Sequence, residues 1–122
     1  MYTSKFTSDA LDNIKKLPRN VRNALKREFK HKIHIDPIGC SEPLSGPLES
    51  FRSFHYGDYR VIYRVFDDIK AVSVVGIGKK DRNHQTEIYK KLEQLAQSGK
   101  LAAAVLDTYR SISPNIKPTE GN

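Results

Sequence analysis

The sequence contains a single cysteine, Cys40, among its 122 residues. One thiol cannot form an internal disulfide, so a disulfide-rich secreted scaffold is excluded and a reducing, cytoplasmic location is expected. No run of about 18 apolar residues is present, which predicts no membrane span and no membrane partner. The first residues lack the apolar core of a signal peptide, so export by that route is not expected.

Clustered carboxylates are also missing. Residues 51–85 contain four acidic side chains, and all of them fall at predicted turns or strand ends. These are Asp58, Asp67, Asp68 and Asp81. A two-metal nuclease needs grouped carboxylates and a glycosidase needs a pair in one cleft. His31 and His34, with Cys40 nearby, lack the ligand number and spacing of a zinc site. The sequence therefore predicts no metal and no cofactor.

Basic residues are in excess, with 21 Lys and Arg against 14 Asp and Glu, so the net charge is +7. This charge on a small chain points first to a nucleic acid, then to an acidic protein, and last to a membrane surface. The segment 19–33 concentrates it, since only Glu28 is acidic there. Its cations are Arg19, Arg22, Lys26, Arg27, Lys30 and Lys32. A solvated face and a partner-binding face both fit this pattern.

The length predicts one domain over residues 1–111, followed by a flexible tail over residues 112–122. Alternating residues predict a short strand over 2–6, and Thr7 or Ser8 can cap the helix that follows. Its apolar stripe is Ala10, Leu11, Ile14 and Leu17. Pro18 ends that helix and is expected at the first position of the next one. The second helix carries a four-residue ladder of Val21, Leu25, Phe29 and Ile33, and a loop is expected over 36–48.

From Phe51 the hydrophobic period changes to two, which predicts a three-stranded antiparallel meander over residues 51–77. Gly57-Asp58 and Asp67-Asp68 are the expected two-residue turns. The second turn would pair Phe66 with Ile69, Arg64 with Ala71, Ile62 with Ser73 and Arg60 with Val75. The first turn would place His55 directly across from Arg60 and on the same face, whereas a one-residue bulge would put Arg52 on that face instead of His55.

Two further helices are predicted after the meander. Ile88, Leu92, Leu95 and Ala96 form the stripe of the first, Gly99 ends it, and Leu101, Val105 and Tyr109 mark the second. The element order is therefore β-αα-βββ-αα, an α+β fold with helices on one face of a small antiparallel sheet. We expect the two N-terminal helices to cover the face of Val61 and Tyr63, and the face of Arg60 to remain open.

The open face would group cations, imidazoles and one phenol without any carboxylate. Its expected members are His55, Arg60, Arg64, Lys79, Lys80, Arg82, His84 and Tyr89. Cations hold and stabilise a phosphate, while imidazoles and phenols move protons, so the set suits cleavage of a phosphodiester without metal. The alternative is an ordinary solvated sheet face that happens to be basic.

Several of these segments resemble the RelE/ParE toxin superfamily. The resemblance covers roughly residues 2–92 and is carried by Leu44-Ser45-Gly46-Pro47-Leu48, by the hairpin Gly57-Asp58-Tyr59-Arg60-Val61-Ile62-Tyr63, and by the segment from Gly78-Lys79-Lys80 to Tyr89. It implies the RelE-like microbial ribonuclease fold, with two N-terminal helices packed on one face of the sheet and C-terminal helices after it.

The resemblance also implies a function. Such a chain is expected to be the toxin of a type II toxin–antitoxin pair, held in a hetero-oligomer by a cognate antitoxin. RelE-like toxins cleave mRNA on the ribosome without metal, by attack of the 2′-hydroxyl on the adjacent phosphate. Two alternatives stay open: a ParE-like inhibitor of DNA gyrase, and a member without activity that only binds its antitoxin.

Roles carry over residue by residue from this resemblance. Arg60 matches the arginine that stabilises the transition-state phosphate, Lys80 the later basic residue (with Arg82 as a substitute), and Tyr89 the late tyrosine that orients the nucleotide or moves a proton. His55 and His84 are the two candidates for proton transfer. Arg52, Arg64, Lys79 and Arg82 are the expected contacts to RNA.

Overall fold

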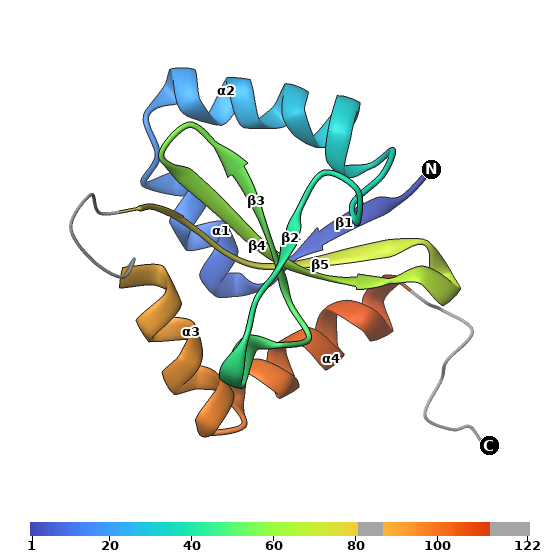
Figure 1. Cartoon of the computed structure of the whole chain (residues 1–122), viewed down its shortest axis with the longest axis vertical. Helices are drawn as coiled ribbons and strands as arrows, with labels where there is room; N and C mark the ends of the chain where they lie inside the picture. The colour runs from blue at the N-terminus through green and yellow to red at the C-terminus, as the bar shows by residue number, and fades with distance from the viewer. Residues whose placement is uncertain (81–86, 113–122) are drawn as a thin grey trace.

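The computed structural model describes residues 1–80 and 87–112, and they form the predicted α+β fold around a five-stranded sheet (Figure 1). The strand order is β1-β5-β4-β3-β2, in which β1 runs parallel to β5 and all other neighbours are antiparallel. The strands are β1 (Thr3–Phe6), β2 (Glu42–Pro43), β3 (Arg52–Tyr56), β4 (Tyr59–Phe66) and β5 (Ala71–Lys79). The helices are α1 (Ser8–Lys15), α2 (Arg19–Glu28), α3 (Glu87–Gln97) and α4 (Lys100–Ile112), with short turns η1 (Phe29–Ile33), η2 (Gly46–Leu48) and η3 (Asp67–Ile69).

The N-terminal helices cover one face of the sheet, as predicted. Thr7 caps α1 by accepting the N–H of Ala10 at 3.2 Å. The ladder of α2 and η1 is buried against β4 and β5, in one core with Val61, Tyr63 and Val74. Two details differ from expectation. Leu11, expected in the apolar stripe of α1, is 46% exposed. Pro18 is the N-cap residue of α2 and not its first helical residue, which is Arg19.

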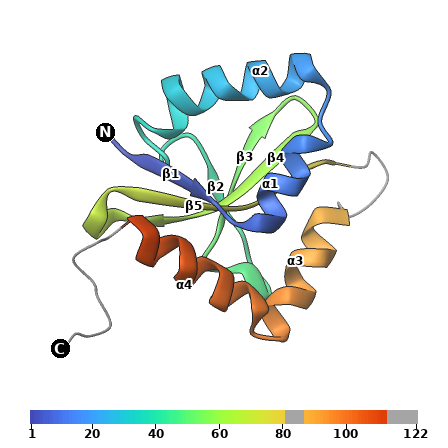
Figure 2. The ribbon, with the colours of Figure 1, turned by 180° about the vertical axis from the view of Figure 1, so that it is seen from behind.

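The opposite face is also covered, which corrects the expectation of helices on one side only. In Figures 1 and 2, α3 and α4 lie across the sheet from α2. A second core forms there from Leu48, Phe51, Ile62, Val75, Ile88, Leu92, Leu101 and Val105. Ile62 and Val75 are apolar and lie on the face that Arg60 also shares. Removing their side chains from water drives this packing. The glycines of β5 allow a close approach, since a Cβ on Gly76 would lie 2.8 Å from Cδ1 of Ile88.

The register of the meander is correct for one hairpin and wrong for the other. Across β3 and β4, His55 pairs with Arg60 without any register shift, so the alternative bulge that exchanged Arg52 for His55 is wrong. Between β4 and β5 the connection spans residues 67–70 instead of two residues, because η3 ends on Lys70 with φ of 51°. Phe66 therefore pairs with Ala71. The register then shifts between Ile62 and Tyr63, which brings Arg60 opposite Gly78.

The expected loop over 36–48 also contains β2, which adds an outer strand to β3. Helix α4 ends at Ile112, so all but the first residue of the expected tail lies outside the described residues. Within the described chain, no helix has the length and apolarity to cross a membrane.

Candidate functional site

The centre of the site is the β3–β4 hairpin. Gly57, with φ of 56°, allows the tight turn that sets the register, and the ladder then places His55 and Arg60 side by side on one face. Directly opposite residues in such a ladder have Cβ atoms about 4.5–5.5 Å apart. The guanidinium of Arg60 donates from Nη1 to the carbonyl oxygens of Gly57 at 2.8 Å and Tyr59 at 3.0 Å. These bonds hold the cation beside the turn.

Lys80 joins this pair through the backbone. It follows β5, and its N–H donates to the carbonyl oxygen of Asp58 in the hairpin turn at 2.6 Å. The anchor ties the end of β5 to the turn between β3 and β4. The structure therefore brings Lys80 from the end of β5 to His55 and Arg60 of the hairpin.

The pKa of the His55 imidazole is lowered below its ordinary value. Partial burial is the main cause, and the positive charges of Arg60 and Lys80 act in the same direction, while the carboxylate of Glu42 opposes them. Burial and the two cations therefore both favour the neutral form of the ring. A neutral imidazole at physiological pH can accept a proton, so His55 is suited to act as a base.

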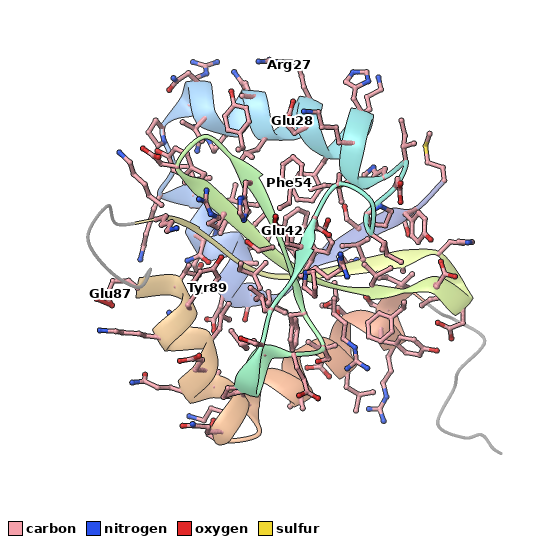
Figure 3. All side chains as sticks on the ribbon, in the orientation of Figure 1. Arg27, Glu28, Glu42, Phe54, Glu87 and Tyr89 are labelled. Atoms are coloured by element: carbon pink, nitrogen blue, oxygen red, sulfur yellow. The ribbon has the colours of Figure 1, made fainter. Side chains whose placement is uncertain are left out.

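Glu42 is a member of the site that sequence reasoning missed. It lies on β2 (Figure 3), opposite Ser53 of β3. With His55 it lines a hollow of about 240 Å³. Gly39, Cys40, Ser41 and Ser53 complete the lining. The two-residue strand contains a proline and has no periodicity, so no pattern marked it as part of the sheet. The site therefore includes a carboxylate that its sequence pattern did not show.

Tyr89 reaches the same face from α3. Its hydroxyl is 2.9 Å from Oγ of Ser53, which precedes His55 by two residues on β3. Residues two apart on a strand point to the same side, about 6.6 Å from one another along the chain. The Tyr89 hydroxyl therefore lies at Ser53, the neighbour of His55 on the same face of β3.

The remaining candidates are dispersed. Arg52 pairs with Tyr63 on the opposite face, where its guanidinium donates to Ser41 Oγ at 2.7 Å and so holds the 38–41 loop. Arg64 shares the face of Arg60 but lies about 13 Å along β4, with its guanidinium 4.9 Å from the ring centre of Phe66. Lys79 pairs with Tyr59, so it also belongs to the opposite face. Arg82 and His84 lie outside the described residues.

Metal ligands do not gather in the described part of the chain: no three His, Cys, Asp or Glu side chains come close enough to hold an ion. His34, one of the histidines weighed as a ligand, instead has Nε2 2.8 Å from Oγ of Ser4. The three residues at the hairpin offer two cations and a base, and cations of this kind bind phosphate oxygens.

A second concave surface lies on the other face of the sheet. The hollow has a volume of about 620 Å³ and runs between α1, β1 and α2. Its apolar residues include Phe6, Ile14, Leu17 and Phe29, and its basic residues are Arg22, Lys26 and Lys30. We call it the α1–α2 groove. An apolar floor beside three cations suits an amphipathic segment with acidic side chains.

Residues 4–84 match the family described as the ParE toxin of the type II toxin–antitoxin system parDE, which is more than half of the chain. The chain therefore belongs to the RelE/ParE toxin superfamily.

Individual relatives are similar over most of their own length. The chain is 27% identical over 90 residues to toxin RelG of Mycobacterium tuberculosis, covering 74% of this chain and 98% of RelG. Toxin RelE of the same organism is 25% identical over 84 residues, covering 69% and 87%. Among solved structures, the toxin–antitoxin complex RelBE2 of M. tuberculosis has a TM-score of 0.61 at 27% identity, covering 64% and 96%. The isolated RelE toxin of Escherichia coli has a TM-score of 0.58 at 26% identity, covering 77% and 97%.

Proposed function

We propose that this toxin is an endoribonuclease that cleaves mRNA on the ribosome without a metal ion. The observation that supports it is the grouping of His55, Arg60 and Lys80 at the hairpin, which combines a neutral base with two phosphate-binding cations. The similarity to toxins named RelG and RelE favours the same branch of the superfamily.

The reaction follows from the chemistry of these groups. Neutral His55 takes the proton of a ribose 2′-hydroxyl, and the 2′-oxygen forms a bond to the adjacent phosphorus. Negative charge grows on the phosphate oxygens, where Arg60 and Lys80 stabilise it. The bond from phosphorus to the 5′-oxygen breaks, and that oxygen takes a proton from an acid, for which the Tyr89 hydroxyl is the described candidate. The products carry a 2′,3′-cyclic phosphate and a 5′-hydroxyl.

A cognate antitoxin is the proposed protein partner, joined to the toxin in a hetero-oligomer. The net charge of +7 and the basic residues beside the α1–α2 groove support an acidic partner. The similar structures include the toxin–antitoxin complexes RelBE2 of M. tuberculosis and RelBE of E. coli. Binding of the antitoxin is expected to weaken as salt rises from 50 to 500 mM, on the order of tenfold or more. Equal affinity at both concentrations would contradict the electrostatic part of the proposal.

The cleavage test uses programmed ribosomes, the full chain and excess chelator, with the residual Mg²⁺ kept just high enough to hold ribosomes together. Cleaved mRNA is expected, and its 3′ ends should carry cyclic phosphate. A 5′-phosphate product would instead indicate attack by water, as metal nucleases perform it. Replacing the 2′-hydroxyl at the cleavage point with hydrogen should abolish cleavage, since the nucleophile is then missing.

The second candidate is inhibition of DNA gyrase, which is favoured by the match to the ParE family. A gyrase inhibitor acts through binding and needs no base beside a phosphate site. Supercoiling of plasmid by purified gyrase, assayed with wild-type toxin, separates the two functions. Inhibited supercoiling together with intact mRNA would replace the ribonuclease proposal.

A further inference from the structure

Ser53 is a buried polar residue at the centre of the candidate site. It is 2% exposed, and its Oγ lies 2.9 Å from the hydroxyl of Tyr89. Its partner across the sheet, Ile62, is fully buried, so water is excluded from that side. A buried hydroxyl needs a hydrogen-bond partner, and Tyr89 supplies it for Ser53.

The same bond fixes the position of Tyr89. The tyrosine is half-buried on α3, one residue after Ile88, which packs against Gly76 and Gly78 of β5. The contact of Ile88 with the two glycines sets the distance between α3 and the sheet. The bond to Ser53 then fixes the position of the Tyr89 hydroxyl. When the Ser53 hydroxyl donates to the Tyr89 oxygen, the hydrogen of the Tyr89 hydroxyl stays available to a phosphate or ribose oxygen.

We propose that Ser53 is a positioning residue, which holds the Tyr89 hydroxyl beside His55 so that the tyrosine meets the RNA in one fixed orientation. The inference rests on the proposed ribonuclease function and assigns a role to a residue that touches no substrate in the mechanism above. Preorganised contacts are effective because the orientation is fixed before the substrate arrives.

A purely structural role is the competing explanation, and the chain contains a control for it. Ser73 of β5 and Thr108 of α4 form a second buried hydroxyl pair on the same face, with their oxygens 2.6 Å apart. That pair joins α4 to the sheet as Ser53 and Tyr89 join α3. Ser73→Ala therefore removes a matched buried hydrogen bond from a place outside the candidate site.

The experiment measures cleavage on programmed ribosomes and binding of a labelled RNA that carries a 2′-deoxynucleotide at the cleavage point. Ser53→Ala is expected to lower the cleavage rate about tenfold, and Tyr89→Phe by at least as much because it also removes the proposed proton donor. The double variant should be no slower than Tyr89→Phe alone, because Ser53 acts only through that hydroxyl. Ser53→Thr keeps the hydroxyl and should retain most of the rate. Ser73→Ala should lower the melting temperature while the cleavage rate stays within about twofold.

Binding of the uncleavable RNA separates failure of this inference from failure of the proposed function. If wild type cleaves but Ser53→Ala loses only thermal stability, as Ser73→Ala does, Ser53 is a structural anchor and the inference is wrong. Additive losses in the double variant would also overturn it. If wild type binds the RNA without cleaving it, the proposed function is wrong, and a Ser53→Ala binding loss that disappears in the Tyr89→Phe background would still support the positioning role. If wild type neither binds nor cleaves, both are wrong.

Discussion

His55 and Arg60 lie directly opposite each other on the β3–β4 hairpin, so a lowered-pKa imidazole and a permanent cation share one face of the sheet. This pairing gives the site its proposed chemistry. In the proposed mechanism, a phosphate bound by the guanidinium would lie within reach of a ring that can accept a proton, and Lys80, anchored to the turn by its backbone, would add a second cation.

Arg60→Ala is expected to reduce mRNA cleavage by about 100-fold or more, because a contact that stabilises the transition-state phosphate is lost. The free energy of unfolding should change by less than about 1 kcal/mol, since among the described residues the side chain bonds only to the carbonyl oxygens of the exposed turn and its own strand. Cleavage rate and urea denaturation check the two halves. Wild-type cleavage by the variant would remove Arg60 from the mechanism.

The cleavage rate should depend on pH through His55. A base works in its neutral form, which predominates above its pKa, so the rate should fall as pH drops through a pKa lower than the ordinary value of 6.5. Glu42→Gln removes the carboxylate that raises this pKa, so the acidic limb of the profile should move to lower pH. Glu49→Gln, an exposed carboxylate outside the hollow, is the control and should leave the limb in place. A limb that stays fixed in Glu42→Gln would show that the carboxylate does not act on the base.

The hairpin could be predicted from the sequence because Gly57 and Asp58 are typical turn residues and the flanking strands alternate strictly. The next connection could not, because Lys70 adopts a left-handed conformation that its residue type does not signal. Coverage of the second face was missed for a different reason. The alternating arginines at 60 and 64 indicated a solvated face, while Ile62 between them required a partner that only tertiary packing could supply.

Site residues were predictable to the extent that they follow from the hairpin register. His55 and Arg60 form the expected cross-strand pair. Lys80, the residue after β5, is held near them by its backbone bond to Asp58. Glu42 was not predictable, because its place beside Ser53 depends on a strand of two residues. Arg52 was expected to contact RNA, but it pairs with Tyr63 and lies on the opposite face. A shift of one residue in the register would have reversed the faces of Arg52 and His55.

Tyr63→Phe should lower the free energy of unfolding by about 1 kcal/mol while cleavage remains close to wild type. The ring is fully buried on the face opposite the site, and its hydroxyl donates to the carbonyl oxygen of Pro37 at 2.6 Å. Burial raises the pKa of Tyr63, so the hydroxyl stays protonated as the donor. Removal of the hydroxyl leaves a buried carbonyl with one donor fewer, which costs about this amount. Chemical denaturation measures the change, and a variant as stable as wild type would contradict the role of this bond.

Gly76→Ala should destabilise the protein by about 1–3 kcal/mol, because its Cβ would lie 2.8 Å from Cδ1 and 3.0 Å from Cγ1 of Ile88. Helix α3 must then shift, and Tyr89 moves with it, so cleavage should fall as well. Ile88→Val removes the Cδ1 methyl and alone should cost about 0.5–1.5 kcal/mol. In the Gly76→Ala background the same change should instead recover part of the lost stability. The free energies of unfolding of wild type, both single variants and the double variant give the coupling directly. Additive effects would mean that the alanine is accommodated elsewhere and that contact with Ile88 does not set the position of α3.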